Sequence, residues 1–184
     1  MNLLIYIKHL MELLLVPAMG WEAVTRCGAD PKVTDHKGFY PWLGVTCLTE
    51  FVQLFYGHGA SFVGLLERAI VLGGAMFASY FLAKLILDLT LSDHIEGGAV
   101  NTSRVAVFCS YMLGLDCLFS MIENLLPTPL TFLLFLPLLG ISVVFKGAGY
   151  LGVKEGSLLN FTVLAAVATI IVPLGLTAIL LLFV

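Results

Sequence analysis

Charged residues are scarce in this sequence. Nine Lys and Arg and twelve Asp and Glu make up 11% of its 184 residues and leave a formal net charge of −3. A soluble domain has about 25% charged residues, and a nucleic-acid partner requires a field of basic side chains. Hydrophobic residues account for 60% of the chain, more than a domain of this size can bury. The composition argues against a soluble domain and a nucleic-acid binder, and it predicts an integral membrane protein.

The cysteines and histidines form no pattern that binds a metal or performs catalysis. No two cysteines make a C-x-x-C pair, which argues against a disulfide framework and a zinc site. No two histidines have the i, i+4 spacing of a zinc protease. We expect the cysteines to be small reduced hydrophobes and the histidines to be solvated in loops and at the interface. They are Cys27, Cys47, Cys109 and Cys117, and His9, His36, His58 and His94.

One sequence motif matches a nucleotide-binding pattern, but the segments around it do not fit a nucleotide-binding fold. Residues 147–152 read G-x-G-x-x-G, but this motif binds pyrophosphate only where it follows a strand and opens a helix. Here it follows an apolar stretch, so it is predicted to be a loop. The sequence has no G-x-S-x-G elbow and no Walker loop. We therefore expect no enzyme activity and no cofactor.

What the sequence has instead is long apolar runs. A membrane-spanning helix needs about 20 mostly apolar residues, and turn-forming Gly, Pro, Asn and Asp separate the runs. Pro137 and Pro173 lie inside the last two runs and are expected to kink them. The prediction is an all-α polytopic bundle of five transmembrane helices, at residues 39–56, 67–88, 104–124, 130–146 and 157–184.

The segment before these spans differs from them. In the apolar stretch 2–26, Lys8, His9 and Glu12 fall on one helical face, which predicts an amphipathic helix lying in the membrane interface. Residues 1–38 are therefore expected to be a cytoplasmic or interfacial segment, and residues 39–184 the transmembrane domain. The residues assigned to the opposite, apolar face are Leu3, Ile7, Leu10, Met11 and Leu14.

Basic residues predict the orientation. Cytoplasmic loops of membrane proteins carry an excess of Lys and Arg. With a cytoplasmic N-terminus and five spans, only Arg68 lies on the opposite side. The sequence thus predicts a protein of the cell membrane with its N-terminus inside and its C-terminus outside. The eight basic residues on or near the inner side are Lys8, Arg26, Lys32, Lys37, Lys84, Arg104, Lys146 and Lys154.

Two acidic residues are expected near the middle of the bilayer, where ionisable groups are costly. Glu50 shares a helix face with Thr46 and Gln53, and Asp116 shares one with Ser120. The two carboxyl groups are expected at similar depth, where both cannot stay charged. This group is the candidate intramembrane polar site. Two structural ion pairs are expected beside it, Arg68 with Glu123 and Lys84 with Asp88.

Two interpretations of Glu50 and Asp116 are open. One is a proton- or cation-handling pair. The other is a protonated acid that is hydrogen-bonded to Thr, Gln or Ser across helices and so holds the helix register.

The order of these features resembles the YIP family of Rab-interacting five-span membrane proteins, in its bacterial branch. The resemblance rests on Pro-Ala-Met-Gly-Trp-Glu at 17–22, Tyr-Pro at 40–41, Ser-Arg-Val-Ala-Val at 103–107, and the stretch 138–184 with Lys-Gly at 146–147 and Leu-Gly-Val at 151–153. It implies a multi-pass helical protein with a cytoplasmic N-terminus and no enzymatic activity. The long acidic domain and the Asp-Leu-Tyr-Gly-Pro motif of the Rab-binding relatives are missing from this sequence, so no binding residues are carried over.

The expected function is a non-enzymatic scaffold or trafficking-type role that organises the membrane. Its expected partners are the lipid bilayer and other membrane proteins, including a second copy of the chain. The alternative is a small ion or solute transporter or channel, proton-coupled through Glu50 and Asp116.

Overall fold

The computed structural model describes residues 2–56, 61–95, 98–127 and 136–183, and this part of the chain is helical and has no β-strand. Short 3-10 or π segments interrupt several of the helices. The α-helices are α1 (Leu3–Leu15), α2 (Pro17–Arg26), α3 (Pro31–Thr34), α4 (Tyr40–Thr49), α5 (Phe62–Thr90), α6 (Thr102–Asn124), α7 (Leu136–Leu151), α8 (Leu158–Ala166) and α9 (Val172–Leu181).

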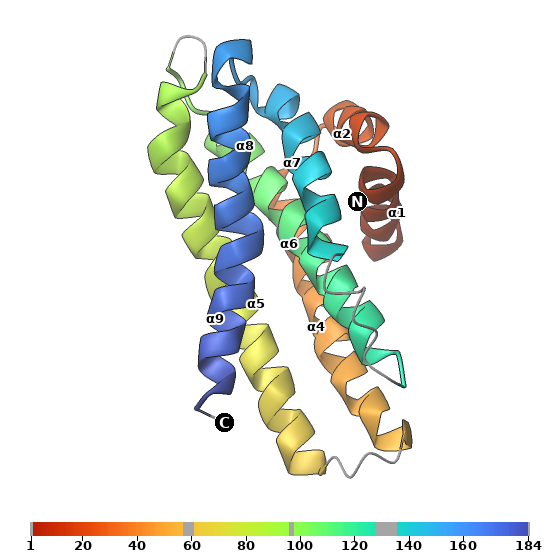
Figure 1. The fold of residues 1–184 in the computed structure, drawn as a ribbon. Helices are drawn as coiled ribbons and strands as arrows, with labels where there is room; N and C mark the ends of the chain where they lie inside the picture. The colour runs from red at the N-terminus through yellow and green to blue at the C-terminus, as the bar shows by residue number, and fades with distance from the viewer. Residues whose placement is uncertain (1, 57–60, 96–97, 128–135, 184) are drawn as a thin grey trace.

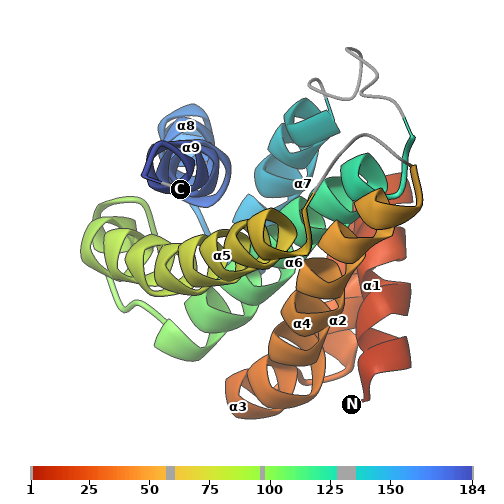
Figure 2. The same cartoon turned by 90° about the horizontal axis from the view of Figure 1, so that it is seen from below.

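Helix α6 is the centre of the bundle. Every residue from Val105 to Phe119 is buried, and α4, α5 and α7 all pack against it. Seen along the bundle, α6 lies between the α4 side and the α7 side, while α9 lies beyond α5 (Figure 2). The buried stretch is apolar or small except for a few groups, among them Ser110 and Asp116, so a ring of helices replaces water around α6 on all faces.

The long segments alternate in direction, so that their ends gather at two levels (Figure 1). At one end, the backbone N–H of Lys154 donates to the carbonyl of His94 at 2.9 Å, and Ile95 forms an isolated β-bridge with Val153. At the opposite end, the hydroxyl of Tyr56 donates to the carbonyl of Leu125 at 2.5 Å. Residues 94–95 and 153–154 therefore lie together at one end, and residues 56 and 125 lie together at the other.

Three of the helical segments are long and apolar enough to cross a membrane: Phe62–Asp93, Thr102–Asn124 and Glu155–Leu181. They correspond to the second, third and fifth predicted spans. The first predicted span consists of α4 and the 3-10 segment Glu50–Tyr56. The fourth corresponds to the shorter apolar helix α7, and its residues 130–135 lie outside the described residues.

The two prolines lie in different settings. Pro173 follows the π-helical segment Val167–Ile171, where the helix accommodates a proline that donates no backbone hydrogen bond. Pro137 lies at the edge of the described part of α7, next to residues 128–135, which lie outside the described residues. The kink expected at Pro137 therefore stays a prediction.

The N-terminal helices α1 and α2 pack against the bundle as a hairpin. The indole N–H of Trp21 donates to the carbonyl of Val143 at 2.9 Å, and its ring stacks on Phe108 with centroids 5.2 Å apart. Gly20 lets the two helices touch, because a Cβ there would lie 2.7 Å from the Leu13 backbone.

The buried face of α1 differs from the expected one. It consists of Tyr6, His9, Leu10 and Leu13, so His9 lies on the protein side and was wrongly assigned to the polar face with Lys8. Met11, assigned to the apolar face, is exposed. Hydrophobic periodicity assigns polar residues to the exposed face of a helix. Tyrosine and histidine can still be buried where the fold supplies hydrogen-bond partners.

Candidate functional site

Glu50 lies where α4 gives way to the 3-10 segment, beside the C-terminal end of α6. The side-chain amide of Asn124 donates to Glu50 Oε1 at 2.9 Å and to Thr49 Oγ1 at 3.2 Å. In return, the amide of Gln53 donates to the carbonyl of Asn124 at 2.8 Å. Glu50 and Gln53, which the sequence placed on one helix face, each form a hydrogen bond with Asn124, a residue that the prediction did not include. This cluster fixes the end of the first segment to the end of α6.

A cavity of about 460 Å³ adjoins this cluster. Arg68 faces the same cavity as Glu50, whereas the predicted partner Glu123 is exposed. In the described part of the chain, Arg68 forms no ion pair within 4 Å. The Arg68–Glu123 pair is therefore not formed. The lining residues are Glu50, Gly64, Glu67, Arg68, Leu72, Asn124, Thr177 and Leu181.

Asp116 lies apart from this cavity. It is buried, with 5% of its surface exposed, and its Oδ2 has no hydrogen-bond partner among the described residues. Asn124, the partner of Glu50, lies about 12 Å further along α6 by helix rise. The structure therefore does not bring Glu50 and Asp116 into one site.

The other polar residues of the predicted site have local roles. The hydroxyl of Thr46 donates to the carbonyl of Trp42 at 3.0 Å and approaches that of Cys117 at 3.5 Å. Ser120 is half-buried on α6. Thr46 therefore contributes to the contact between α4 and α6, about one helical turn before Glu50.

The second predicted ion pair is not formed either. Lys84 and Asp88 lie one turn apart on α5, but no contact within 4 Å joins them, and Asp88 Oδ1 is buried without a hydrogen-bond partner in the described structure. The ion pairs found in this part of the chain are Lys8–Glu12 at 3.6 Å and Arg26–Glu22 at 3.1 Å. Both are i, i+4 pairs on the N-terminal helices; Arg26–Glu22 is exposed, and Lys8–Glu12 has a half-buried carboxyl. Surface pairs of this spacing add only about 0.3–0.5 kcal/mol.

Sequence reasoning missed Asp35, which joins three elements. It lies in the π-helical segment Asp35–Phe39 and accepts hydrogen bonds from the hydroxyls of Tyr80 on α5, at 2.8 Å, and Ser110 on α6. The carbonyl of Ser110 accepts from Tyr6 on α1 at 2.6 Å. No spacing in the sequence connects these residues, so only the fold could reveal the cluster.

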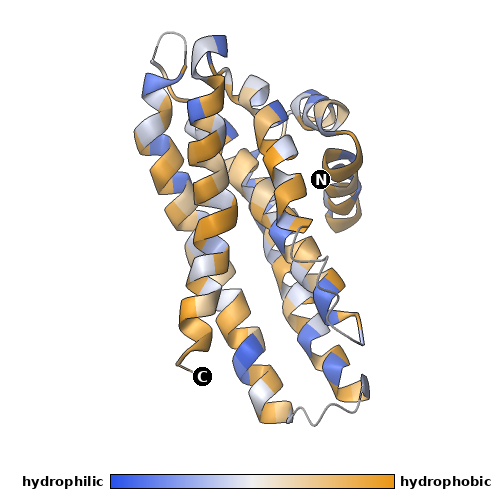
Figure 3. Cartoon of the chain, in the orientation of Figure 1, coloured by the Kyte–Doolittle hydropathy of each residue, from blue (hydrophilic) through white to orange (hydrophobic). Residues whose placement is uncertain are grey.

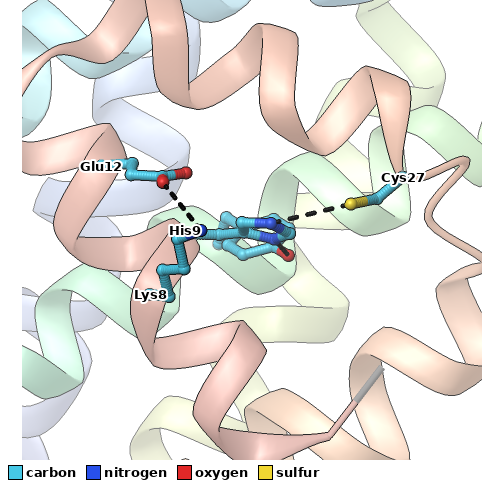
Figure 4. A network of polar contacts seen from close by, with 5 residues as sticks. Lys8, His9, Glu12 and Cys27 are labelled. Atoms are coloured by element: carbon cyan, nitrogen blue, oxygen red, sulfur yellow. Dashed lines mark hydrogen bonds and ion pairs between the residues drawn. The ribbon is translucent and has the colours of Figure 1, made fainter.

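Sequence reasoning also missed a contact between a thiol and an imidazole in the N-terminal hairpin. Cys27 Sγ lies 3.7 Å from His9 Nε2, and Figure 4 shows the sulfur directed at the ring. His9 Nδ1 lies 3.0 Å from the hydroxyl of Tyr111 on α6. His9 is only 5% exposed, which corrects its expected solvated position. Burial, with Lys8 nearby, lowers the pKa of the His9 imidazole, although Glu12 acts in the opposite direction.

No protein-family model, curated protein or solved structure matches the chain. The geometry therefore has to support the function by itself. Among the described residues, no group of three or more His, Cys, Asp or Glu side chains is placed to hold a metal ion. Some of the buried polar side chains join one helix to another, as Ser110 does with Asp35. Others, such as Thr162 and Thr169, bond only within their own helix.

Proposed function

We propose that this chain is a multi-pass integral protein of the cell membrane, similar to the YIP family, that organises lipids or partner membrane proteins without catalysing a reaction. The observation that carries the proposal is the division of its polar groups. Several of those inside the bundle, among them Trp42, Ser110 and Asn124, bond α6 to its neighbours, whereas the outer surface is largely apolar. Such a molecule presents a fixed hydrophobic surface to lipid and to other helices.

The outer surface supports membrane insertion. Hydrophobic residues cover most of α8, α9 and the middle of α5 (Figure 3). A soluble monomer rarely exposes contiguous apolar patches of more than a few hundred Å². The large apolar side chains exposed here include Ile70, Phe81, Leu85 and Leu89 on α5, Leu138 and Phe145 on α7, and Leu159, Val163, Leu174 and Ile179 on α8 and α9.

The alternation of direction supports five crossings with the N-terminus inside. Arg104 and Lys154 flank the end at which the connections after α5 and α7 meet, and the guanidinium of Arg104 donates to the carbonyl of Tyr150 there at 3.2 Å. Arg68 lies at the opposite end, in the cavity with Glu50. This separation agrees with the rule that basic residues stay on the cytoplasmic side.

The separation of Glu50 and Asp116 favours the role of holding helix register. A proton relay needs its groups within hydrogen-bond reach or joined by water. Here Glu50 is bonded to Asn124, and Asp116 does not line the cavity. The double variant Glu50→Gln, Asp116→Asn keeps the shapes of both side chains. We expect it to fold, to insert into the membrane and to retain the same co-purifying lipids and proteins.

Recovery of those partners is the test of the scaffold role. The full chain is extracted in mild detergent after crosslinking in cells, and its lipids and proteins are identified. An enriched set that persists in the double variant supports the proposal. Recovery of only the bulk lipid composition, with no protein and no second copy of the chain, contradicts it.

The cavity beside Arg68 favours one alternative, a small ion or solute transporter or channel. Its volume of about 460 Å³ and its charged lining by Glu50, Glu67 and Arg68 suit a small polar solute. Reconstituted vesicles test this function directly. Flux of protons, alkali cations or small anions that is abolished by Glu50→Gln would favour transport over the scaffold role.

A further inference from the structure

The N-terminal hairpin contains a cavity of about 730 Å³, which lies within the range of small-molecule sites, roughly 300–1,000 Å³. Both members of the thiol–imidazole contact line it. Cys27 is exposed at the end of α2, and His9 is buried in its wall. The other lining residues are Lys8, Met11, Glu12, Leu15, Val16, Met19, Ala23 and Arg26.

A second, more apolar groove of about 870 Å³ borders this cavity. The two share Leu15 and Val16 at the corner between α1 and α2. From that corner the groove follows the outer sides of α7 and α8, the surface assigned to lipid above. Its other lining residues are Pro17, Ala18, Leu138, Ile141, Ser142, Phe145, Lys146, Leu159 and Thr162.

A thiol that lines one cavity, with an apolar groove bordering that cavity, fits a long hydrocarbon chain with a reactive carbonyl. Cysteines on amphipathic or juxtamembrane helices are the usual acceptors of reversible S-acylation, and each CH₂ removed from water adds about 0.8 kcal/mol to membrane affinity. We propose that Cys27 is a self-acylating residue that accepts a fatty acyl group from a long-chain acyl thioester, with His9 as the base and the groove as the binding site of the chain.

The chemistry balances without an oxidant or a metal. When His9 donates its Nδ1–H to the Tyr111 hydroxyl, the lone pair of Nε2 faces Cys27. Nε2 takes the thiol proton while Sγ attacks the carbonyl carbon of the donor. The bond from that carbon to the donor sulfur breaks, and the proton passes from His9 to the departing thiolate. The product is one acyl thioester on Cys27 and one free donor thiol.

Tyr111 is a positioning residue in this scheme. Its hydroxyl lies 3.0 Å from His9 Nδ1 and fixes the imidazole ring. The phenol ring of Tyr111 stacks on that of Tyr6 with centroids 5.0 Å apart. A neutral imidazole is the form that can accept the thiol proton.

The test uses the full chain in detergent micelles with hexadecanoyl-coenzyme A as the probe. Labelled adducts are released with neutral hydroxylamine, which cleaves thioesters, and are located by mass spectrometry. We expect a single thioester on Cys27, abolished in Cys27→Ser and unchanged in the matched control Cys47→Ser, whose thiol is half-buried in α4. No adduct, or equal labelling of Cys47, overturns the proposal.

Variants of His9 test whether the acylation rate depends on the base or only on the accessibility of the Cys27 thiol. We expect His9→Gln to slow acylation about 100-fold, the lower range for loss of a general base. Tyr111→Phe, which keeps the ring packing, is expected to slow it less and serves as the second variant if His9→Gln does not fold. An undiminished rate in the folded variants would make the reaction ordinary thiol chemistry and overturn the role of the site.

The groove is tested by chain length. Ser142→Phe fills it from an exposed position. We expect slower transfer from hexadecanoyl-coenzyme A and an unchanged rate from acetyl-coenzyme A. Equal effects on both donors would contradict the assignment of the groove to the hydrocarbon chain. None of these outcomes depends on the scaffold role, which is measured by co-purification.

Discussion

At the residue scale, the close approach of α1 and α2 depends on the absence of one side chain. A Cβ at Gly20 would lie 2.7 Å from the backbone nitrogen and Cα of Leu13, and these main-chain atoms cannot move aside as a side chain could. Gly20→Ala is therefore expected to destabilise the protein by about 1–3 kcal/mol, the usual cost of overpacking. Thermal unfolding in detergent, followed by tryptophan fluorescence, measures the loss.

Gly74 provides the matched control for this substitution. It also lies within a helix, but a Cβ there would meet nothing within 4 Å. Because alanine is a better helix former than glycine by about 1 kcal/mol, Gly74→Ala should leave stability unchanged or raise it. Equal stability of the two variants would mean that α1 and α2 do not pack as closely as described.

His9 gives the N-terminal hairpin a dependence on pH. Burial lowers the pKa of the folded His9 imidazole. Glu12 raises this pKa, and Lys8 lowers it further. The unfolded chain therefore binds a proton more readily than the folded one. Stability is complete above the unfolded pKa of about 6.5 and falls as the pH drops below it, by at most about 1.4 kcal/mol per pH unit for one proton.

Chemical denaturation between pH 7 and pH 5 checks this expectation. The wild-type chain should lose stability over that interval, and His9→Gln should remove the part of the loss that one proton causes. A loss of equal size in both proteins would assign the pH dependence to other groups.

At the element scale, the first predicted span is held in place by hydrogen bonds to α6. Its second half is a 3-10 segment, whose hydrogen-bond geometry is poorer than that of an α-helix. The bonds from Asn124 to Glu50 and Thr49, and from Gln53 to the Asn124 carbonyl, join this segment and the last residue of α4 to α6. We infer that they compensate for its weaker internal bonding.

Removal of the Asn124 amide tests this role. Asn124→Ala leaves the carboxyl of Glu50 without this donor, at an expected cost of about 1–3 kcal/mol. Asn160→Ala, at an exposed position on α8, is the control and should be nearly neutral. Hydrogen exchange of residues 50–56 should speed up in the first variant only, and protection equal to wild type would argue against the proposed support.

The elements were more predictable than their partners. Hydropathy predicted three segments that the fold contains as long apolar helices, because run length and composition carry that information directly. The polar cluster of Glu50 was half predicted, since helical period places Gln53 on its face. Asn124 comes from another helix, and no period connects helices that are distant in sequence.

At the scale of the whole molecule, Arg104 and Lys154 lie at one end of the bundle and Arg68 at the other. The membrane orientation inferred from the basic residues stays a prediction. The sequence could not predict that α6 would be enclosed, because the central and outer helices of a membrane bundle are both apolar: lipid is as hydrophobic as a protein core. Nor could it predict that Cys27 and His9 would meet, since that contact depends on the turn between α1 and α2. The interior of the fold is where sequence pattern carries least information.

The central claim is that the chain crosses the membrane five times with its N-terminus inside. Single cysteines at four exposed positions test it in a variant whose four native cysteines are replaced. The positions are Ser61 and Leu125 at one end of the bundle, and Asp93 and Glu155 at the other. A membrane-impermeant maleimide should label positions 61 and 125 from outside intact cells and positions 93 and 155 only in inside-out vesicles. Labelling of 93 or 155 from outside, or of 125 and 155 from the same side, would contradict the five crossings.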